Sequence, residues 1–172
     1  MPVRLARAGD AEAIRTIYNR EVTGSTVTFD LVPRTLADQQ GWLSARSGAH
    51  AVVVAVDEED EVVGFGSLSP YRDRPAYSTT VEDSVYVDPA HQGRGVGREI
   101  LGELVAVATA HGFHAVMARV VGGHDASVAL HRACGFDVVG TEREVGRKFG
   151  RWLDVVLMQR LLSESAVSTH RR

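Results

Sequence analysis

The sequence predicts an α/β fold in which helices cover both faces of one mixed sheet. Three observations carry this prediction: short β-branched runs typical of strands, segments with apolar residues at helical spacing, and turn-rich loops between them. They follow one another as strand, two helices, three strands, helix, strand, helix and two strands, an order that indicates a mixed sheet. The 172 residues suffice for one domain. We expect it at residues 1–162, followed by a polar tail at 163–172.

Each expected strand is a short apolar run bounded by turn residues. The clearest is 51–56, a continuous run of Ala and Val that predicts a buried strand. A charged turn at 57–61 makes residues 62–69 its hairpin partner. All the expected strands lie at residues 3–5, 51–56, 62–69, 77–87, 115–121, 137–145 and 152–162, with a turn at 146–150 between the last two.

Each expected helix follows a residue that can begin it. Asp10, Thr35 and Asp125 are suitable caps because their side-chain oxygens can accept hydrogen bonds from free amides of the first turn. Gly135 would end the last helix. The expected helices lie at residues 11–22, around 36–43, at 96–111 and at 127–134.

Composition and charge exclude several classes of protein. Nineteen basic and 22 acidic residues give a net charge of −3, so we expect no nucleic-acid partner. No apolar run approaches the roughly 20 residues of a membrane span, and no signal-peptide pattern is visible, so we expect a cytoplasmic location and no membrane partner. The single cysteine, Cys134, excludes an internal disulfide, and the histidines lack ligand spacing, so no metal is expected.

The strongest motif is the glycine-rich loop Gln-Gly-Arg-Gly-Val-Gly at residues 92–97, between a strand and an amphipathic helix. Its glycines let a ligand approach the backbone closely, and free amides at a helix start attract anions such as a pyrophosphate. A P-loop would need a Lys-Ser or Lys-Thr pair, and the dinucleotide fingerprint needs another glycine spacing. A turn that only permits close packing of helix and sheet stays open as the alternative.

Residues 86–97, together with segments 18–22, 25–30, 81–87, 130–136 and 148–154, resemble the GCN5-related N-acetyltransferases (GNAT), and within them the phosphinothricin and methionine-sulfoximine N-acetyltransferase branch. The resemblance covers nearly the whole chain. It implies a mixed, mostly antiparallel sheet of about seven strands that splays in the middle, acetyl-CoA as co-substrate, and a homodimer.

The resemblance also implies where the coenzyme binds. The strand before the loop would pair with the pantetheine arm, strand 116–121 would form the other lip of the splay, and the loop amides would hold the pyrophosphate. His124 stands where the family usually has an Asn. The implied coenzyme-binding residues are Val85, Tyr86, Val87, Gly93, Arg94, Gly95, Val96, Gly97, Arg98, His124 and Ser127.

For the chemistry, Glu82 aligns with the family's catalytic Glu and is the expected base, acting through a water. A carboxylate that only pairs with an arginine is the alternative. His131 takes the position where many relatives have a Tyr, so we expect it to protonate the leaving thiolate, or else to contact coenzyme A or pack. Cys134 suits a small buried side chain better than a nucleophile, so we expect direct transfer in a ternary complex.

The expected acceptor is a small molecule carrying an amine. The resemblance implies that arginines in the loop after the third strand grip a carboxylate, which favours an amino acid or analogue such as phosphinothricin, methionine sulfoximine or methionine sulfone. A different amine (polyamine, aminoglycoside or protein N-terminus) and a non-catalytic acyl-CoA sensor stay open. The expected substrate-binding residues are Val27, Phe29, Arg72, Asp73, Arg74, Glu82, Asp83 and Ser84.

Overall fold

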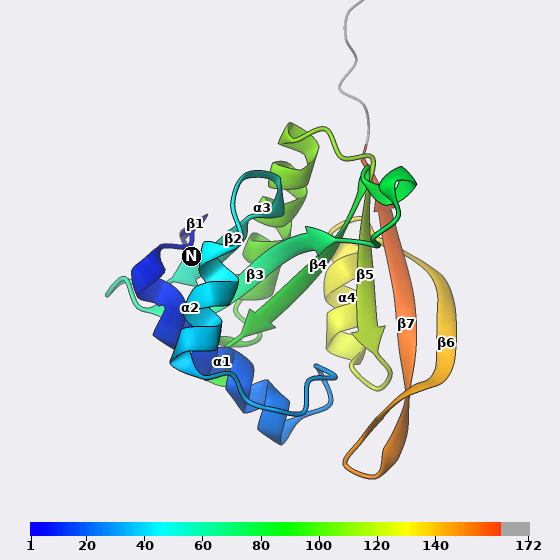
Figure 1. Ribbon diagram of the computed structural model, residues 1–172, viewed down its shortest axis with the longest axis horizontal. Helices are drawn as coiled ribbons and strands as arrows, with labels where there is room; N and C mark the ends of the chain where they lie inside the picture. The colour runs from blue at the N-terminus through cyan, green and yellow to red at the C-terminus, as the bar shows by residue number, and fades with distance from the viewer. Residues whose placement is uncertain (163–172) are drawn as a thin grey trace, which may run out of the picture.

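A computed structural model describes residues 1–162 and contains one seven-stranded sheet in the order β1-β2-β3-β4-β5-β7-β6 (Figure 1). The expected tail at 163–172 lies outside the described residues. The strands are β1 (Val3–Leu5), β2 (Val52–Val56), β3 (Val62–Pro70), β4 (Thr80–Val87), β5 (Ala115–Val121), β6 (Asp137–Lys148) and β7 (Arg151–Leu161). The helices are α1 (Ala11–Gly24), α2 (Leu36–Ser44), α3 (Val96–Ala110) and α4 (Asp125–Ala133).

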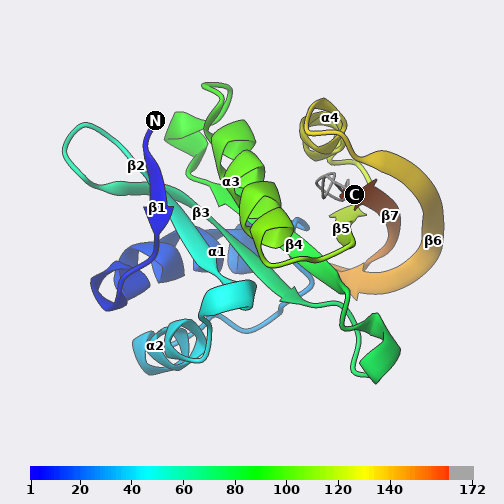
Figure 2. The ribbon, with the colours of Figure 1, turned by 90° about the horizontal axis from the view of Figure 1, so that it is seen from above.

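Helices cover both faces of the sheet, as the sequence predicts. Helices α1 and α2 lie on one side, and α3 and α4 lie on the other (Figure 2). Strand β2 is buried on both faces, because Val53 and Ala55 pack in the core under α3 while Val52 and Val54 pack against α1 and α2. This explains why its sequence is a continuous apolar run.

The sheet splays between β4 and β5. These two strands are parallel and pair only where Thr80–Glu82 faces Ala115–Met117, whereas all other neighbouring strands pair antiparallel. Beyond Glu82, β4 stays bonded to β3 as far as Val87. Asp88 N–H donates to Val63 O at 2.9 Å, on the β3 side. Because successive residues of a strand direct their amides to opposite sides, the backbone of residues 83, 85 and 87 faces the gap.

The glycine-rich loop leads directly into α3. Gly93 and Gly95 have φ angles of 73° and 82°, a region that residues with a Cβ seldom adopt. Gly95 occupies the N-cap position with no side-chain cap. A Cβ at Gly97 would lie 3.1 Å from the Leu130 side chain of α4. Close packing therefore explains Gly97, whereas backbone conformation explains the other two.

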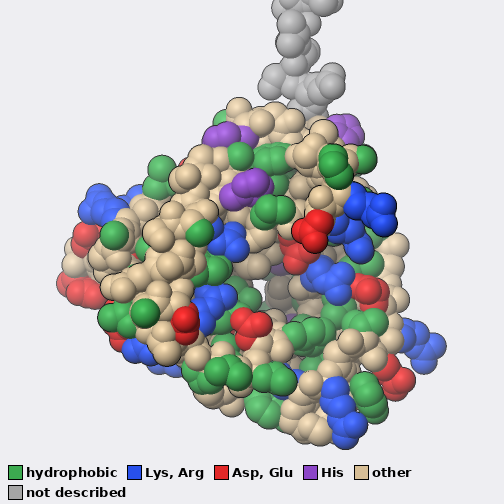
Figure 3. All heavy atoms as spheres, viewed as in Figure 1, with side chains coloured by type: hydrophobic (Ala, Val, Ile, Leu, Met, Phe, Trp, Pro, Cys, Tyr) green, Lys and Arg blue, Asp and Glu red, His purple; other side chains and the backbone are tan. Residues whose placement is uncertain are grey.

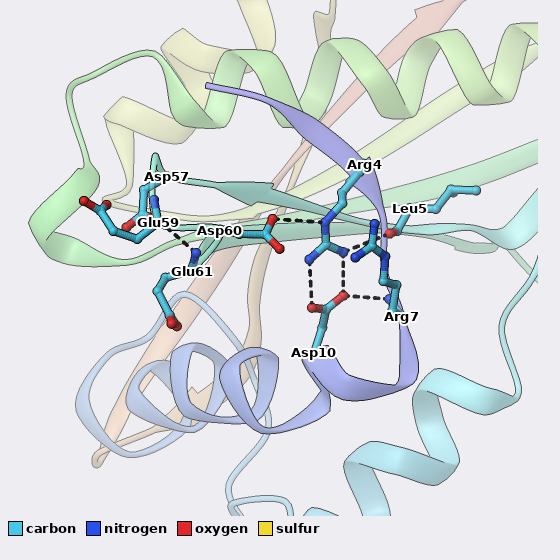
Figure 4. A network of polar contacts seen from close by, with 8 residues as sticks. All are labelled: Arg4, Leu5, Arg7, Asp10, Asp57, Glu59, Asp60 and Glu61. Carbon is cyan, nitrogen blue, oxygen red and sulfur yellow. Dashed lines mark hydrogen bonds and ion pairs between the residues drawn. The ribbon is translucent and has the colours of Figure 1, made fainter.

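Two of the predicted helix caps are wrong. The Asp10 carboxylate does not cap α1, because it accepts from Arg4 Nη1 at 2.8 Å, from Arg4 Nη2 at 3.1 Å and from Arg7 N–H at 2.6 Å (Figure 4). Helix α4 begins at Asp125 itself, with His124 in the N-cap position. The third cap is confirmed, since Asp38 N–H donates to Thr35 Oγ1 at 3.1 Å.

Two predicted strand ends are also wrong. Residues 77–79 are outside β4, because Pro75–Tyr77 forms a 3₁₀ turn in which Tyr77 N–H donates to Arg74 O at 2.9 Å. Strand β6 extends beyond residue 145 to Lys148, since an irregularity between Glu142 and Gly146 lets pairing with β7 resume.

Candidate active site

The splay opens into a cavity of about 210 Å³. Figure 3 shows a hollow near the centre of this face of the molecule, with acidic and basic side chains around it. Its lining comes from both faces of the sheet, so the cavity extends through the gap between the strands. The lining residues are Val27, Thr28, Phe29, Glu82, Asp83, Ser84, Val85, Tyr86, Arg119, Val120, Val121, His124, Ser127, His131 and Val155.

Glu82 is half-buried in this cavity, on the face of β4 that looks toward α1. Tyr86, on the same face, packs edge-on against Tyr18 of α1 with ring centroids 5.3 Å apart. Burial raises the pKa of Glu82, and the positive charge of Arg119 partly opposes that rise. A carboxyl group with a raised pKa inside a cavity is a stronger base than an ordinary glutamate, which suits it to accepting a proton.

Asp83 points to the opposite face of β4 and pairs with His131 of α4. Asp83 Oδ2 lies 2.9 Å from His131 Nε2, and His131 Nδ1 lies 2.7 Å from Ser127 O. Each of the two residues is only 5% exposed. A carbonyl only accepts, so Nδ1 carries a hydrogen, and Nε2 faces a carboxylate with which it can share a second proton.

The protonation of His131 reflects a balance of opposing effects. Burial alone lowers the pKa of His131, but the hydrogen bond and negative charge of Asp83, together with Ser127 O, outweigh it and raise the pKa overall. The other oxygen, Asp83 Oδ1, is buried without a hydrogen-bond partner among residues 1–162. The raised pKa favours a proton on the imidazole beside the Asp83 carboxylate.

Sequence reasoning missed one charged residue of the cavity, Arg119. It lies on β5, and its Nη1 forms an ion pair with Glu142 Oε1 of β6 at 2.7 Å. A signal was present: Arg119 is the one charged side chain in the apolar run of residues 115–121. In the structure it is also the one residue of that strand that is not buried.

The loop after α1 supplies Val27 and Phe29, two of the expected substrate-binding residues, to the cavity wall. The loop is held from the C-terminal half of the chain, because Lys148 Nζ donates to Thr28 O at 2.8 Å. The Phe29 ring lies against the backbone of Gly146, where a Cβ would come within 2.4 Å of Phe29 Cε2.

The predicted coenzyme-binding residues fall into two groups. Val85, Tyr86, His124 and Ser127 line the cavity. His124 Nε2 lies 2.9 Å from Thr26 Oγ1, so it also connects α4 to the loop after α1. Val87 and residues 93–98 are outside the cavity lining, at the end of β4 and the start of α3.

Arg72, Asp73 and Arg74 are not brought into the cavity. They line a separate surface depression with Tyr71 and Tyr77. The Arg72 guanidinium carbon lies 5.0 Å from the centre of the Tyr71 ring. Its charge still reaches the cavity, because it acts to lower the pKa of Glu82, although less than Arg119 does.

Within residues 1–162, no group of three or more His, Cys, Asp or Glu side chains is arranged to hold a metal ion. In the same range, no helix combines the length and the apolar character needed to cross a membrane.

Comparisons with known proteins agree with this architecture. Residues 12–136 match the acetyltransferase (GNAT) family. An L-methionine sulfoximine/L-methionine sulfone acetyltransferase of Pseudomonas paraeruginosa is 39% identical over 91% of this chain and 92% of its own. A phosphinothricin N-acetyltransferase of Streptomyces coelicolor is 40% identical over 89% and 91%. A phosphinothricin acetyltransferase of Sinorhizobium meliloti, solved with AcCoA, is 40% identical, covers 96% of this chain and 90% of its own, and has a TM-score of 0.91. The chain therefore belongs to the acetyltransferase (GNAT) family of N-acetyltransferases.

Proposed function

We propose that the protein transfers the acetyl group of acetyl-CoA to the α-amino group of a small amino acid or analogue, by direct transfer in a ternary complex. The observation that carries the proposal is the cavity in the splay, with the Glu82 carboxyl group on one side and the buried His131–Asp83 pair on the other. The relatives named for methionine sulfoximine, methionine sulfone and phosphinothricin support this class of acceptor.

The residues present fit the coenzyme. Backbone groups of residues 83, 85 and 87 face the gap, where an amide-containing pantetheine arm can pair with them as a strand would. Gly95 leaves the first amides of α3 without a side-chain cap, and Arg94 and Arg98 lie beside them, which suits a pyrophosphate. Acetyl-CoA supplies the activated acetyl group, and His124 and Ser127 at the start of α4 can contact the arm.

The proton transfers follow from the two sides of the cavity. An α-ammonium has no lone pair, so it first loses a proton, and the Glu82 carboxylate accepts that proton through a water. The amine nitrogen then bonds to the acetyl carbon, and the carbon–sulfur bond breaks. The sulfur leaves as a thiolate, and the His131–Asp83 pair supplies the proton that converts it to the thiol of coenzyme A. The second proton of the nitrogen goes to solvent.

The direct test is to measure release of coenzyme A with a panel of amines, for the wild type and for Glu82→Gln. The panel contains L-methionine sulfone, L-methionine sulfoximine, phosphinothricin, a polyamine, an aminoglycoside and a peptide N-terminus. We expect turnover with amino acids, and a kcat at least about 100-fold lower for Glu82→Gln. Turnover only with the polyamine, aminoglycoside or peptide would show that the acceptor is not an amino acid. Binding of acetyl-CoA without turnover of any amine would support a non-catalytic acyl-CoA sensor.

We also propose that the protein is a cytoplasmic homodimer. Exposed apolar side chains on the β6–β7 hairpin, including Val139, Val145, Phe149 and Trp152, support a contact with a second copy. Light scattering during gel filtration checks this, and a monomer mass at micromolar concentration would contradict it.

A further inference from the structure

We propose that Arg119 binds the acid group of the acceptor, and that Glu142 orients it. This inference rests on the proposed function, because it concerns the acceptor of the same cavity. It differs from the expectation drawn from the sequence, in which Arg72 and Arg74 hold the carboxylate.

The first argument is location. Among the described residues, Arg119 is the one Lys or Arg side chain that lines the cavity with Glu82. Its side chain is 32% exposed, so a ligand in the cavity can reach it. The guanidinium has five N–H donors in a fork, and within residues 1–162 its ion pair is with a single group, Glu142. Donors therefore stay free for a carboxylate.

The second argument is the position of Arg119 relative to Glu82. In the parallel register, Glu82 faces Met117, and Arg119 lies two residues farther along β5, on the same face as Met117. Glu82 and Arg119 thus stand diagonally across the gap, and after burial, which raises the pKa of Glu82, the charge of Arg119 has the largest effect on that pKa and lowers it. An α-amino acid carries an ammonium and a carboxylate one carbon apart. Glu82 on β4 can face the ammonium, and Arg119 on β5 can face the carboxylate.

A purely structural role for the Arg119–Glu142 pair is a weak explanation. Strand β7 lies between β5 and β6 and is hydrogen-bonded to both, so the sheet does not need a side-chain link across it. Partly exposed ion pairs contribute little to stability. A charged side chain in an otherwise apolar strand is better explained by a ligand, with Glu142 fixing the direction of the guanidinium.

The experiment compares acceptors that differ only in the acid group. The wild type, Arg119→Ala, Glu142→Gln and the double variant Arg72→Ala/Arg74→Ala are each assayed with the best amino-acid acceptor of the panel and with its α-carboxamide. Arg143→Ala is the matched control, because it removes an exposed arginine of β6 that is outside the cavity lining. Calorimetric titration of the amino acid into enzyme saturated with coenzyme A gives an independent measure of binding.

For Arg119→Ala we expect the KM and Kd of the amino acid to rise about 10- to 100-fold, with less than about a threefold change for the carboxamide. The KM of acetyl-CoA should be unchanged. Glu142→Gln keeps the guanidinium and should raise the KM less, and Arg143→Ala should have no effect. If Arg119→Ala does not fold, Arg119→Gln takes its place.

Equal losses for acid and carboxamide, or an acid-specific loss confined to the Arg72/Arg74 variant, would overturn the inference. If the wild type acetylates no amino acid at all, the proposed function fails, and this inference fails with it. Only the wild type is needed to observe that outcome, so it is distinguishable from a failure of the inference about Arg119.

Discussion

The imidazole of His131 and the carboxylate of Asp83 lie 2.9 Å apart between α4 and β4, and hardly any of either side chain reaches solvent. Because Asp83 raises the pKa of His131 in the folded protein, the pair contributes stability that depends on pH. That contribution is complete below the ordinary pKa of histidine, about 6.5, and is lost as pH rises through the raised pKa of the folded state.

We therefore predict that Asp83→Asn destabilises the protein by about 1–3 kcal/mol at pH 6, and by less at pH 9. Urea unfolding at both values measures this. Asp73→Asn removes an exposed carboxylate and serves as the control. A loss of stability for Asp83→Asn that is the same at both pH values would contradict a proton shared with His131.

The dependence of kcat/KM on pH should reflect the protonation of the Glu82 carboxylate. Burial raises the pKa of this group above its ordinary value, and only the carboxylate accepts a proton, so kcat/KM should fall as pH decreases through that raised pKa.

The positive charge of Arg119 acts in the opposite direction and lowers the pKa of Glu82. Arg119→Gln should thus shift the acid limb to higher pH, and Arg119→Lys, which keeps the charge, should shift it less. The carboxamide acceptor is used so that binding of the acid group does not interfere. If the acid limb of the pH profile does not move in Arg119→Gln, the charge of Arg119 does not affect the pKa of Glu82.

We predict that replacing Gly95 by alanine destabilises the protein and weakens the binding of coenzyme A. With φ at 82°, an alanine there costs about 1–2 kcal/mol, and relaxation of the strain redirects the first amides of α3, so the affinity for coenzyme A should also fall. Gly102→Ala is the matched control in the same helix, because a Cβ there meets nothing within 4 Å. It should stabilise the protein by about 0.5–1 kcal/mol. Denaturation and calorimetry with coenzyme A measure both. Equal behaviour of the two variants would show that the loop conformation is not required.

We predict that Gly146→Ala weakens binding of the acceptor without affecting binding of acetyl-CoA. The new methyl group would displace the Phe29 ring, which is partly exposed to solvent. We expect a several-fold increase in the KM of the acceptor, an unchanged KM for acetyl-CoA, and a stability loss of about 1 kcal/mol. Gly140→Ala, also in β6 and with nothing within 4 Å of the added Cβ, should leave both KM values unchanged and should not destabilise the protein. An unchanged KM for the acceptor in Gly146→Ala would mean that Phe29 does not contact it.

Much of the fold could be predicted from the sequence, because strands and helices here have strong periodic patterns. The buried run of β2 and the amphipathic α3 are examples. Element ends were less predictable, since distant partners decide them. Nothing in the local sequence around Asp10 indicates that Arg4, on another element, takes its carboxylate. Likewise Tyr77 has strand propensity, but Pro75 starts a 3₁₀ turn that uses its amide.

For the site, the sequence indicated which residues stand on β4 and α4, but not which side chains meet. The pairing of Asp83 with His131 joins residues 48 positions apart and depends on how α4 packs on the sheet. Arg119 was overlooked although residues 116–121 were expected to form a lip of the gap, because the sequence does not show that its side chain shares a cavity with Glu82. The arginines at 72 and 74 are close to β4 in sequence, yet the turn at Pro75–Tyr77 directs their loop to a separate depression.

The brief parallel contact between β4 and β5 divides the molecule into two half-sheets that share one short seam, at Thr80–Glu82. The N-terminal half packs against α1, α2 and α3, and the C-terminal half packs against α4. Forces that pull the halves apart would act first at the open end of this seam. A molecule that bonds to both lips would serve as a clamp across it and would increase the thermal stability of the whole protein.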